Sequence, residues 1–131
     1  DEQWLQLSRP MVKPLPNGEV VLHYDPRIAA PMAQMTREAA QAGEAMLWQL
    51  YEQIKAQVLV LRGAQSDLLT SATATKMQAT GPRAHCVELE GVGHAPTLVT
   101  PGQVKVVSDF LAGKQDRLPR HLSLAEQALA G

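Results

Sequence analysis

The sequence has one cysteine, almost no net charge and no long apolar run, and each shortage excludes a class of protein. A single thiol, Cys86, cannot form a disulfide within the chain, and neither a C-x-x-C motif nor Cys/His metal-ligand spacing surrounds it. A formal net charge of -1 provides no basic field to attract a phosphate backbone. We therefore expect no disulfide scaffold, no metal site and no nucleic-acid partner.

Membrane insertion and export are also not expected from this sequence. No stretch approaches the ~20 apolar residues that a bilayer-spanning helix needs. The opening residues DEQWLQLSRP have neither the basic nor the apolar region of a signal peptide. Together with the lone thiol, these features predict a cytoplasmic protein without a membrane partner.

Length and composition indicate one globular core. The chain has 131 residues, of which 45% are hydrophobic and 19% are charged. A domain of this size buries roughly two thirds of its unfolded surface. We expect three segments: an irregular, proline-rich segment over residues 1–34, a core over 35–113, and a tail with a short amphipathic helix over 114–131.

The first third of the chain contains turn signals followed by helix formers. Prolines exclude a long helix near the start, and Asn17-Gly18 predicts a hairpin whose second strand lies within VVLHY, residues 20–24. Residues 32–55 are rich in helix formers with apolar side chains at helical spacing. They predict one or two helices, with a break at Gly43.

The centre of the chain predicts a parallel sheet. QVLVLRG, residues 57–63, is a continuous aliphatic run of the kind buried on both faces in such a sheet, and AHCVELEG, residues 84–91, resembles a second strand. Residues 70–80 between them predict a crossover helix, with Thr70 or Ser71 as its cap and Gly81-Pro82 at its end. A last helix is expected over residues 101–113. The expected fold class is α/β.

Two polar side chains follow the predicted strands where they end. Asp67 comes shortly after the first strand, and His94 follows the second between Gly93 and Ala95. Because the carboxyl ends of parallel strands meet at one edge of a sheet, a carboxylate and an imidazole are expected on the same rim. Such a pair can form the acid and base of a catalytic triad. The alternatives are a turn or capping role for His94 and a helix N-cap role for Asp67.

At these residues the sequence resembles the C-terminal part of α/β-hydrolases. QVLVLRGAQSDLL is similar to the strand and loop that carry the triad acid, and ELEGVGHAPTLVTPGQVKVVSDFL to those that carry the triad histidine and the closing helix. The resemblance covers about residues 45–113. It implies Asp67 as the acid and His94 as the general base, with the proline-rich start as the end of a cap, and it implies no cofactor and no metal.

The nucleophile of that family is not found in this sequence. None of the serines has the glycine framing of G-x-S-x-G, and Ser66 in GAQSD adjoins the proposed acid. We expect a C-terminal fragment of a hydrolase of ester-like small molecules, inactive alone. Its expected partner is the missing N-terminal half, or a second copy through an exposed strand edge. The alternative is a non-enzymatic α/β binding or assembly module.

Overall fold

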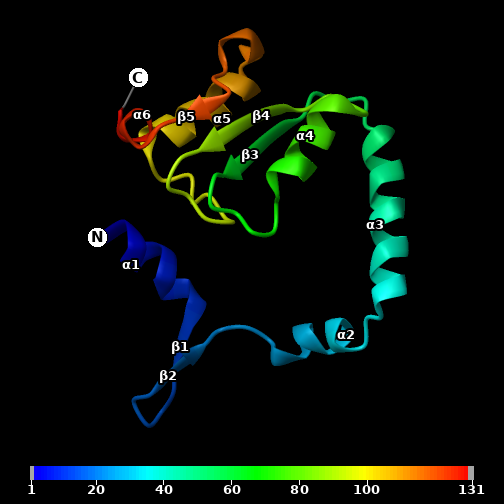
Figure 1. Cartoon of the computed structure of the whole chain (residues 1–131). Coiled ribbons are helices and arrows are strands. Elements are labelled where there is room, and N and C mark those ends of the chain that lie inside the picture. Colours follow the sequence, from blue (N-terminus) through cyan, green and yellow to red (C-terminus); the bar gives the residue numbers. More distant parts are fainter. Residues whose placement is uncertain (1, 130–131) are drawn as a thin grey trace. The chain divides into compact units, whose positions relative to one another are not determined.

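The computed structural model describes residues 2–129, and these residues form two units (Figure 1). The first unit ends at Ala45 and the second begins at Met46. Within residues 2–129, no helix combines the length and the apolar content needed to cross a bilayer. The helices and strands, in chain order, are α1 (Glu2–Ser8), β1 (Val12–Pro14), β2 (Val20–Leu22), α2 (Ala30–Ala33), α3 (Arg37–Glu52), β3 (Leu59–Gly63), α4 (Ser71–Ala79), β4 (His85–Leu89), α5 (Pro101–Leu111), β5 (His121–Leu122) and α6 (Leu124–Ala128).

The first unit contains the predicted hairpin. Strands β1 and β2 pair antiparallel, with Val12 opposite Leu22 and Pro14 opposite Val20. The turn at Asn17-Gly18 is closed by two backbone hydrogen bonds, and Gly18 adopts a φ of 85°, which glycine tolerates best. None of residues 2–45 is buried, so this unit has no hydrophobic core of its own.

Helix α3 contradicts the expected break at Gly43. It runs without interruption from Arg37 to Glu52. A single glycine costs about 1 kcal/mol relative to alanine within a helix, which a long run of strong helix formers can outweigh. The expected break was wrong because the low helix propensity of Gly43 is outweighed by the high propensities of its neighbours.

Replacing Gly43 by alanine should therefore stabilise α3. A Cβ at this position would meet nothing within 4 Å, so the change acts only through the backbone. We expect a gain of about 0.5–1 kcal/mol, visible as higher helical ellipticity and a raised unfolding midpoint in circular dichroism. Gly18→Ala is the matched control, since its surroundings are equally open but its φ is positive, and it should destabilise. A Gly43→Ala protein less stable than the wild type would contradict the continuous helix.

The second unit is built on a three-stranded parallel sheet with the order β3-β4-β5. The predicted strands over residues 57–63 and 84–91 correspond to β3 and β4, which pair with Leu59 opposite His85 and Gly63 opposite Leu89. The predicted crossover helix is α4, whose first turn is capped by the Thr70 side chain. The expectation of an α/β protein with a parallel sheet is confirmed.

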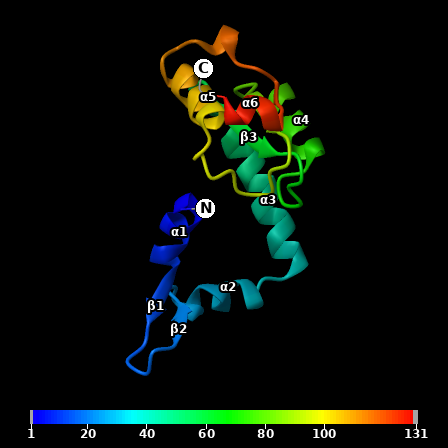
Figure 2. The same cartoon turned by 90° about the vertical axis from the view of Figure 1, so that its left-hand side faces the viewer.

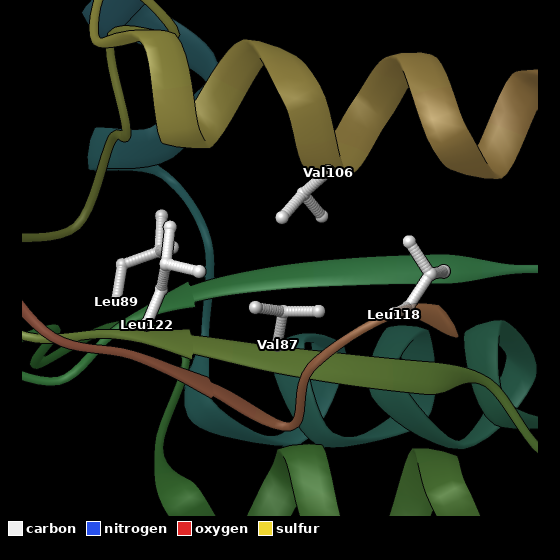
Figure 3. Packing of buried hydrophobic residues seen from close by; sticks show 5 residues of the cluster. All are labelled: Val87, Leu89, Val106, Leu118 and Leu122. Atoms are coloured by element: carbon white, nitrogen blue, oxygen red, sulfur yellow. The ribbon is translucent and has the colours of Figure 1, made fainter. Parts of the chain in front are cut away.

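Alternate residues of the strands face two different helices. Val87 and Leu89 lie on one face and pack against Val106 of α5, as Figure 3 shows. Val60 and Cys86 lie on the other face, in a smaller cluster with Ala74 of α4. Both faces are covered because apolar side chains occupy successive positions in each strand.

The tail extends the sheet. We predicted only a polar connection and a short helix over residues 114–131, whereas residues 121–122 form β5 and pair with the end of β4. Leu118 and Leu122 then join the core beneath α5 (Figure 3). Ser123 begins α6 with a capping box that includes Glu126, and Figure 2 shows α6 beside the start of α5.

Candidate active site

Two loops meet where β3 and β4 end. Residues 64–70 follow β3, and residues 90–100 follow β4. The Ala64 amide donates to the Leu89 carbonyl at 2.9 Å, and the Gln65 amide donates to the Val92 carbonyl at 2.9 Å. The backbone at the start of the first loop is thus hydrogen-bonded to the end of β4 and to the second loop.

Gly63 allows these two segments to approach. A Cβ on Gly63 would lie closer to the carbonyl oxygens of Val92 and Gly93 than any real Cβ can. Gly63 is buried, and the residue next to Gly93 is His94. The loop that carries the imidazole therefore rests directly on the backbone at the end of β3.

The side chain that contacts His94 is Ser66. The Ser66 Oγ lies 3.3 Å from Nδ1 of His94, and it also accepts a hydrogen bond from the Leu69 amide at 3.1 Å. Ser66 is buried and His94 is exposed. One hydroxyl group therefore links the two loops through side-chain atoms.

Asp67 is placed on the same rim but not against the imidazole. It is exposed, and no hydrogen bond or ion pair joins it to His94 within residues 2–129. It does not cap the following helix either, because Thr70 does so. The capping alternative for Asp67 is therefore wrong, and its role as the triad acid stays a prediction, as does the role of His94 as a base.

Arg62 secures the loop that carries Ser66 and Asp67. Its buried guanidinium donates to the Leu69 carbonyl through Nε at 2.8 Å and to the Ala64 carbonyl through Nη2 at 3.4 Å. Its Nη1 lies 2.5 Å from the Glu88 carboxylate on the neighbouring strand. The sequence offered a signal for this residue, since a charged side chain at the end of a buried strand requires partners.

Replacing Arg62 by methionine should loosen this loop while keeping the strand apolar. The change leaves the Leu69 carbonyl without its donor and the half-exposed Glu88 without its cation. Hydrogen bonds to charged groups contribute about 1.5–3 kcal/mol, and we expect a loss of about 2 kcal/mol in urea unfolding. Arg83→Met, at an exposed position, is the control. If the two variants were equally stable, the hydrogen bonds and ion pair of Arg62 would not stabilise this loop.

A chain of buried amides fixes the loop that carries His94. The Leu98 amide donates to Oε1 of Gln103 at 3.0 Å, and Nε2 of Gln103 donates to Oε1 of Gln127 at 2.8 Å. Gln127 in turn donates to the Glu90 carbonyl at 2.8 Å, at the other end of the same loop. Gln103 and Gln127 were missed in the sequence because isolated glutamines form no motif.

The one cysteine has the properties of a structural residue. Cys86 lies in β4 and is buried. Burial raises the pKa of its thiol, and the negative charge of Glu88 adds to the rise, although Arg62 and Arg120 oppose it. The reactive thiolate is therefore disfavoured at neutral pH.

The described residues also indicate whether these loops could hold a metal ion. Across the described part of the chain, no group of three or more histidine, cysteine, aspartate and glutamate side chains is placed to hold a metal ion. Ser66, Asp67 and His94 bring a hydroxyl, a carboxylate and an imidazole to these two loops.

Comparison with known proteins links the chain to a hydrolase. No protein-family model matches the sequence, and no solved structure matches it. A curated protein from Cupriavidus necator, named 3-hydroxybutyrate-oligomer hydrolase, is 45% identical over 115 residues, which is 86% of this chain. The chain spans 39% of the length of that relative. Most of this sequence is therefore similar to a part of a protein that carries the name of a hydrolase.

Proposed function

We propose that this chain supplies the general base, His94, and the triad carboxylate, Asp67, of an α/β-hydrolase that cleaves ester bonds. The observation that carries the proposal is the exposed imidazole at the carboxyl end of a parallel sheet, in a chain 45% identical to part of a hydrolase. Reactive groups gather at that edge in α/β proteins because the loops converge there.

In the proposed mechanism, Nε2 of His94 takes the proton of a nucleophile as the nucleophile attacks the ester carbonyl. The resulting imidazolium then gives this proton to the departing alkoxide, which leaves the acyl group bonded to the nucleophile. His94 next takes a proton from water as the water attacks this acyl carbonyl, and returns the proton to the nucleophile as the carboxylic acid leaves. The Asp67 carboxylate stabilises the imidazolium by its charge. The nucleophile and the oxyanion hole come from residues outside this sequence, which has no G-x-S-x-G, so the chain alone is inactive.

The substrate class follows from the relative's name. An oligomer of 3-hydroxybutyrate is joined through hydroxyl and carboxyl groups, so each linkage is an ester. We propose that the complete enzyme acts on short ester-linked oligomers of a hydroxy acid.

The free edge of β3 is a candidate partner surface. Within residues 2–129, β3 pairs only with β4, and the other edge of β3 has no strand beside it. Unpaired backbone groups on such an edge favour the addition of a strand. We propose that the part of the hydrolase that bears the nucleophile pairs there, with self-association through this edge as the alternative for the isolated chain.

A chimera tests the function directly. This chain replaces the matching segment of the Cupriavidus necator protein, and release of 3-hydroxybutyrate from its dimer and trimer is measured. We expect hydrolysis by the chimera and none by the isolated chain. Circular dichroism and size-exclusion chromatography establish that the chimera is folded. A folded chimera without hydrolysis would favour the non-enzymatic module instead.

A further inference from the structure

The hydroxyl group of Ser66 is placed to control the orientation of the His94 ring. Its Oγ is 3.3 Å from Nδ1, and no hydrogen bond to Nε2 is present among the described residues. The ring is therefore held by one nitrogen only. The other nitrogen, Nε2, is the one that the proposed mechanism uses.

Ser66 itself is firmly held. It is only 7% exposed, its amide donates to the Gly63 carbonyl at 3.0 Å, and its Oγ accepts from the Leu69 amide. Arg62 donates to the Leu69 carbonyl, which limits movement of the same turn. A partner with so little freedom can restrict the ring, whereas the exposed Asp67 side chain forms no hydrogen bond or ion pair within residues 2–129.

A serine oxygen has two lone pairs, and these fit the two neighbours of Ser66 Oγ. One accepts the Leu69 amide, and the second is available for Nδ1–H of His94. An imidazole that donates through Nδ1 carries its free lone pair on Nε2. This is the tautomer that a general base acting through Nε2 requires.

We propose that Ser66 is a positioning residue, whose Oγ accepts the Nδ1–H of His94 and so keeps Nε2 unprotonated and open to solvent. The inference rests on the proposed function of His94 as a base. Two neighbouring residues then have different roles. Ser66 provides the hydrogen bond that orients the His94 ring, and Asp67 provides negative charge without contacting the ring.

The test is nitrogen NMR of the intact chain. Histidine labelled with ¹⁵N reports which ring nitrogen carries the proton in neutral imidazole, and His94→Gln identifies the signals of His94 among the four histidines. We expect the Nδ1–H tautomer to dominate at His94. In Ser66→Ala the ratio of Nδ1–H to Nε2–H should fall about fivefold, as expected for the loss of one hydrogen bond.

Two further variants separate positioning from general damage to the loop. Ser66→Thr keeps the hydroxyl and should retain the wild-type ratio, and Ser108→Ala removes an exposed serine on α5 and should change nothing. A dominant Nε2–H tautomer in the wild type, or the same ratio in wild type and Ser66→Ala, would overturn the proposal. The wild-type measurement decides even if a variant fails to fold.

The NMR measurement of the His94 tautomer does not depend on whether the chimera hydrolyses its substrate. If the tautomer depends on Ser66 but the chimera is folded and inactive, the proposed function fails while the positioning of His94 stands. If the chimera is active but the tautomer ratio of His94 is the same in wild type and Ser66→Ala, only the positioning role of Ser66 fails.

Discussion

Replacing His94 by glutamine in the chimeric hydrolase should lower kcat by about 10⁴- to 10⁶-fold, the range of losses seen when a triad residue is removed. Glutamine can occupy the exposed position but cannot accept and return a proton at neutral pH. We expect KM to change little, because the imidazole acts on the nucleophile rather than in substrate binding. Release of 3-hydroxybutyrate under saturating substrate measures the effect.

His23→Gln is the matched control, since His23 is also exposed but lies in the first unit after β2. It should retain the activity of the chimera. Asp67→Asn should lower kcat as well, with a smaller loss if the carboxylate acts by charge and not by direct contact. Full activity of a folded His94→Gln chimera would remove His94 from the mechanism and return it to the alternative of a turn residue.

Gly63→Ala should be the most destabilising single substitution that we propose. The added methyl group would overlap the carbonyl oxygens of Val92 and Gly93, and backbone atoms cannot move aside as a flexible side chain can. Overpacking a core costs about 1–3 kcal/mol, and each kcal/mol lowers Tm by about 4–8 °C in a domain of 60–100 residues. We expect Tm to fall by roughly 10 °C or more, measured by calorimetry or circular dichroism.

Gly93→Ala tests the same contact from the opposite side. A Cβ on Gly93 would meet nothing within 4 Å, although its carbonyl oxygen is the atom that Gly63 approaches. This variant should keep Tm within a few degrees of the wild type. If both variants unfold at the wild-type temperature, the two loops do not pack as closely as described.

The sequence predicted the central secondary structure well, for identifiable reasons. The aliphatic run of β3 permits little other than a buried strand, and Thr70 begins α4 with a recognisable cap. Strand β5 was missed because two residues, His121 and Leu122, carry no periodic pattern. Its pairing depends on β4 already being in place, which is a tertiary effect.

The candidate site was predicted only in part. Because Asp67 and His94 each follow a parallel strand, the sequence predicted them at the same edge of the sheet. It could not determine which side chain contacts the imidazole of His94. A difference of one residue in a turn decides between Ser66 and Asp67, and that depends on Arg62 and the backbone contacts of the loop. The glutamines that hold the other loop are recognisable only in three dimensions, since Gln103 and Gln127 contact each other across 24 residues.

The hydrogen bonds of Gln127 also set the order in which the site can form during synthesis. The loop that carries His94 is tied at Glu90 to a residue 37 positions later in the chain. A ribosome makes the chain from its N-terminus, so β3, α4 and β4 can pair before α6 has left the exit tunnel. Until then, one anchor of the imidazole loop does not exist. A chain cut before Gln127 should therefore keep β3, α4 and β4 but lose one anchor of the loop that carries His94.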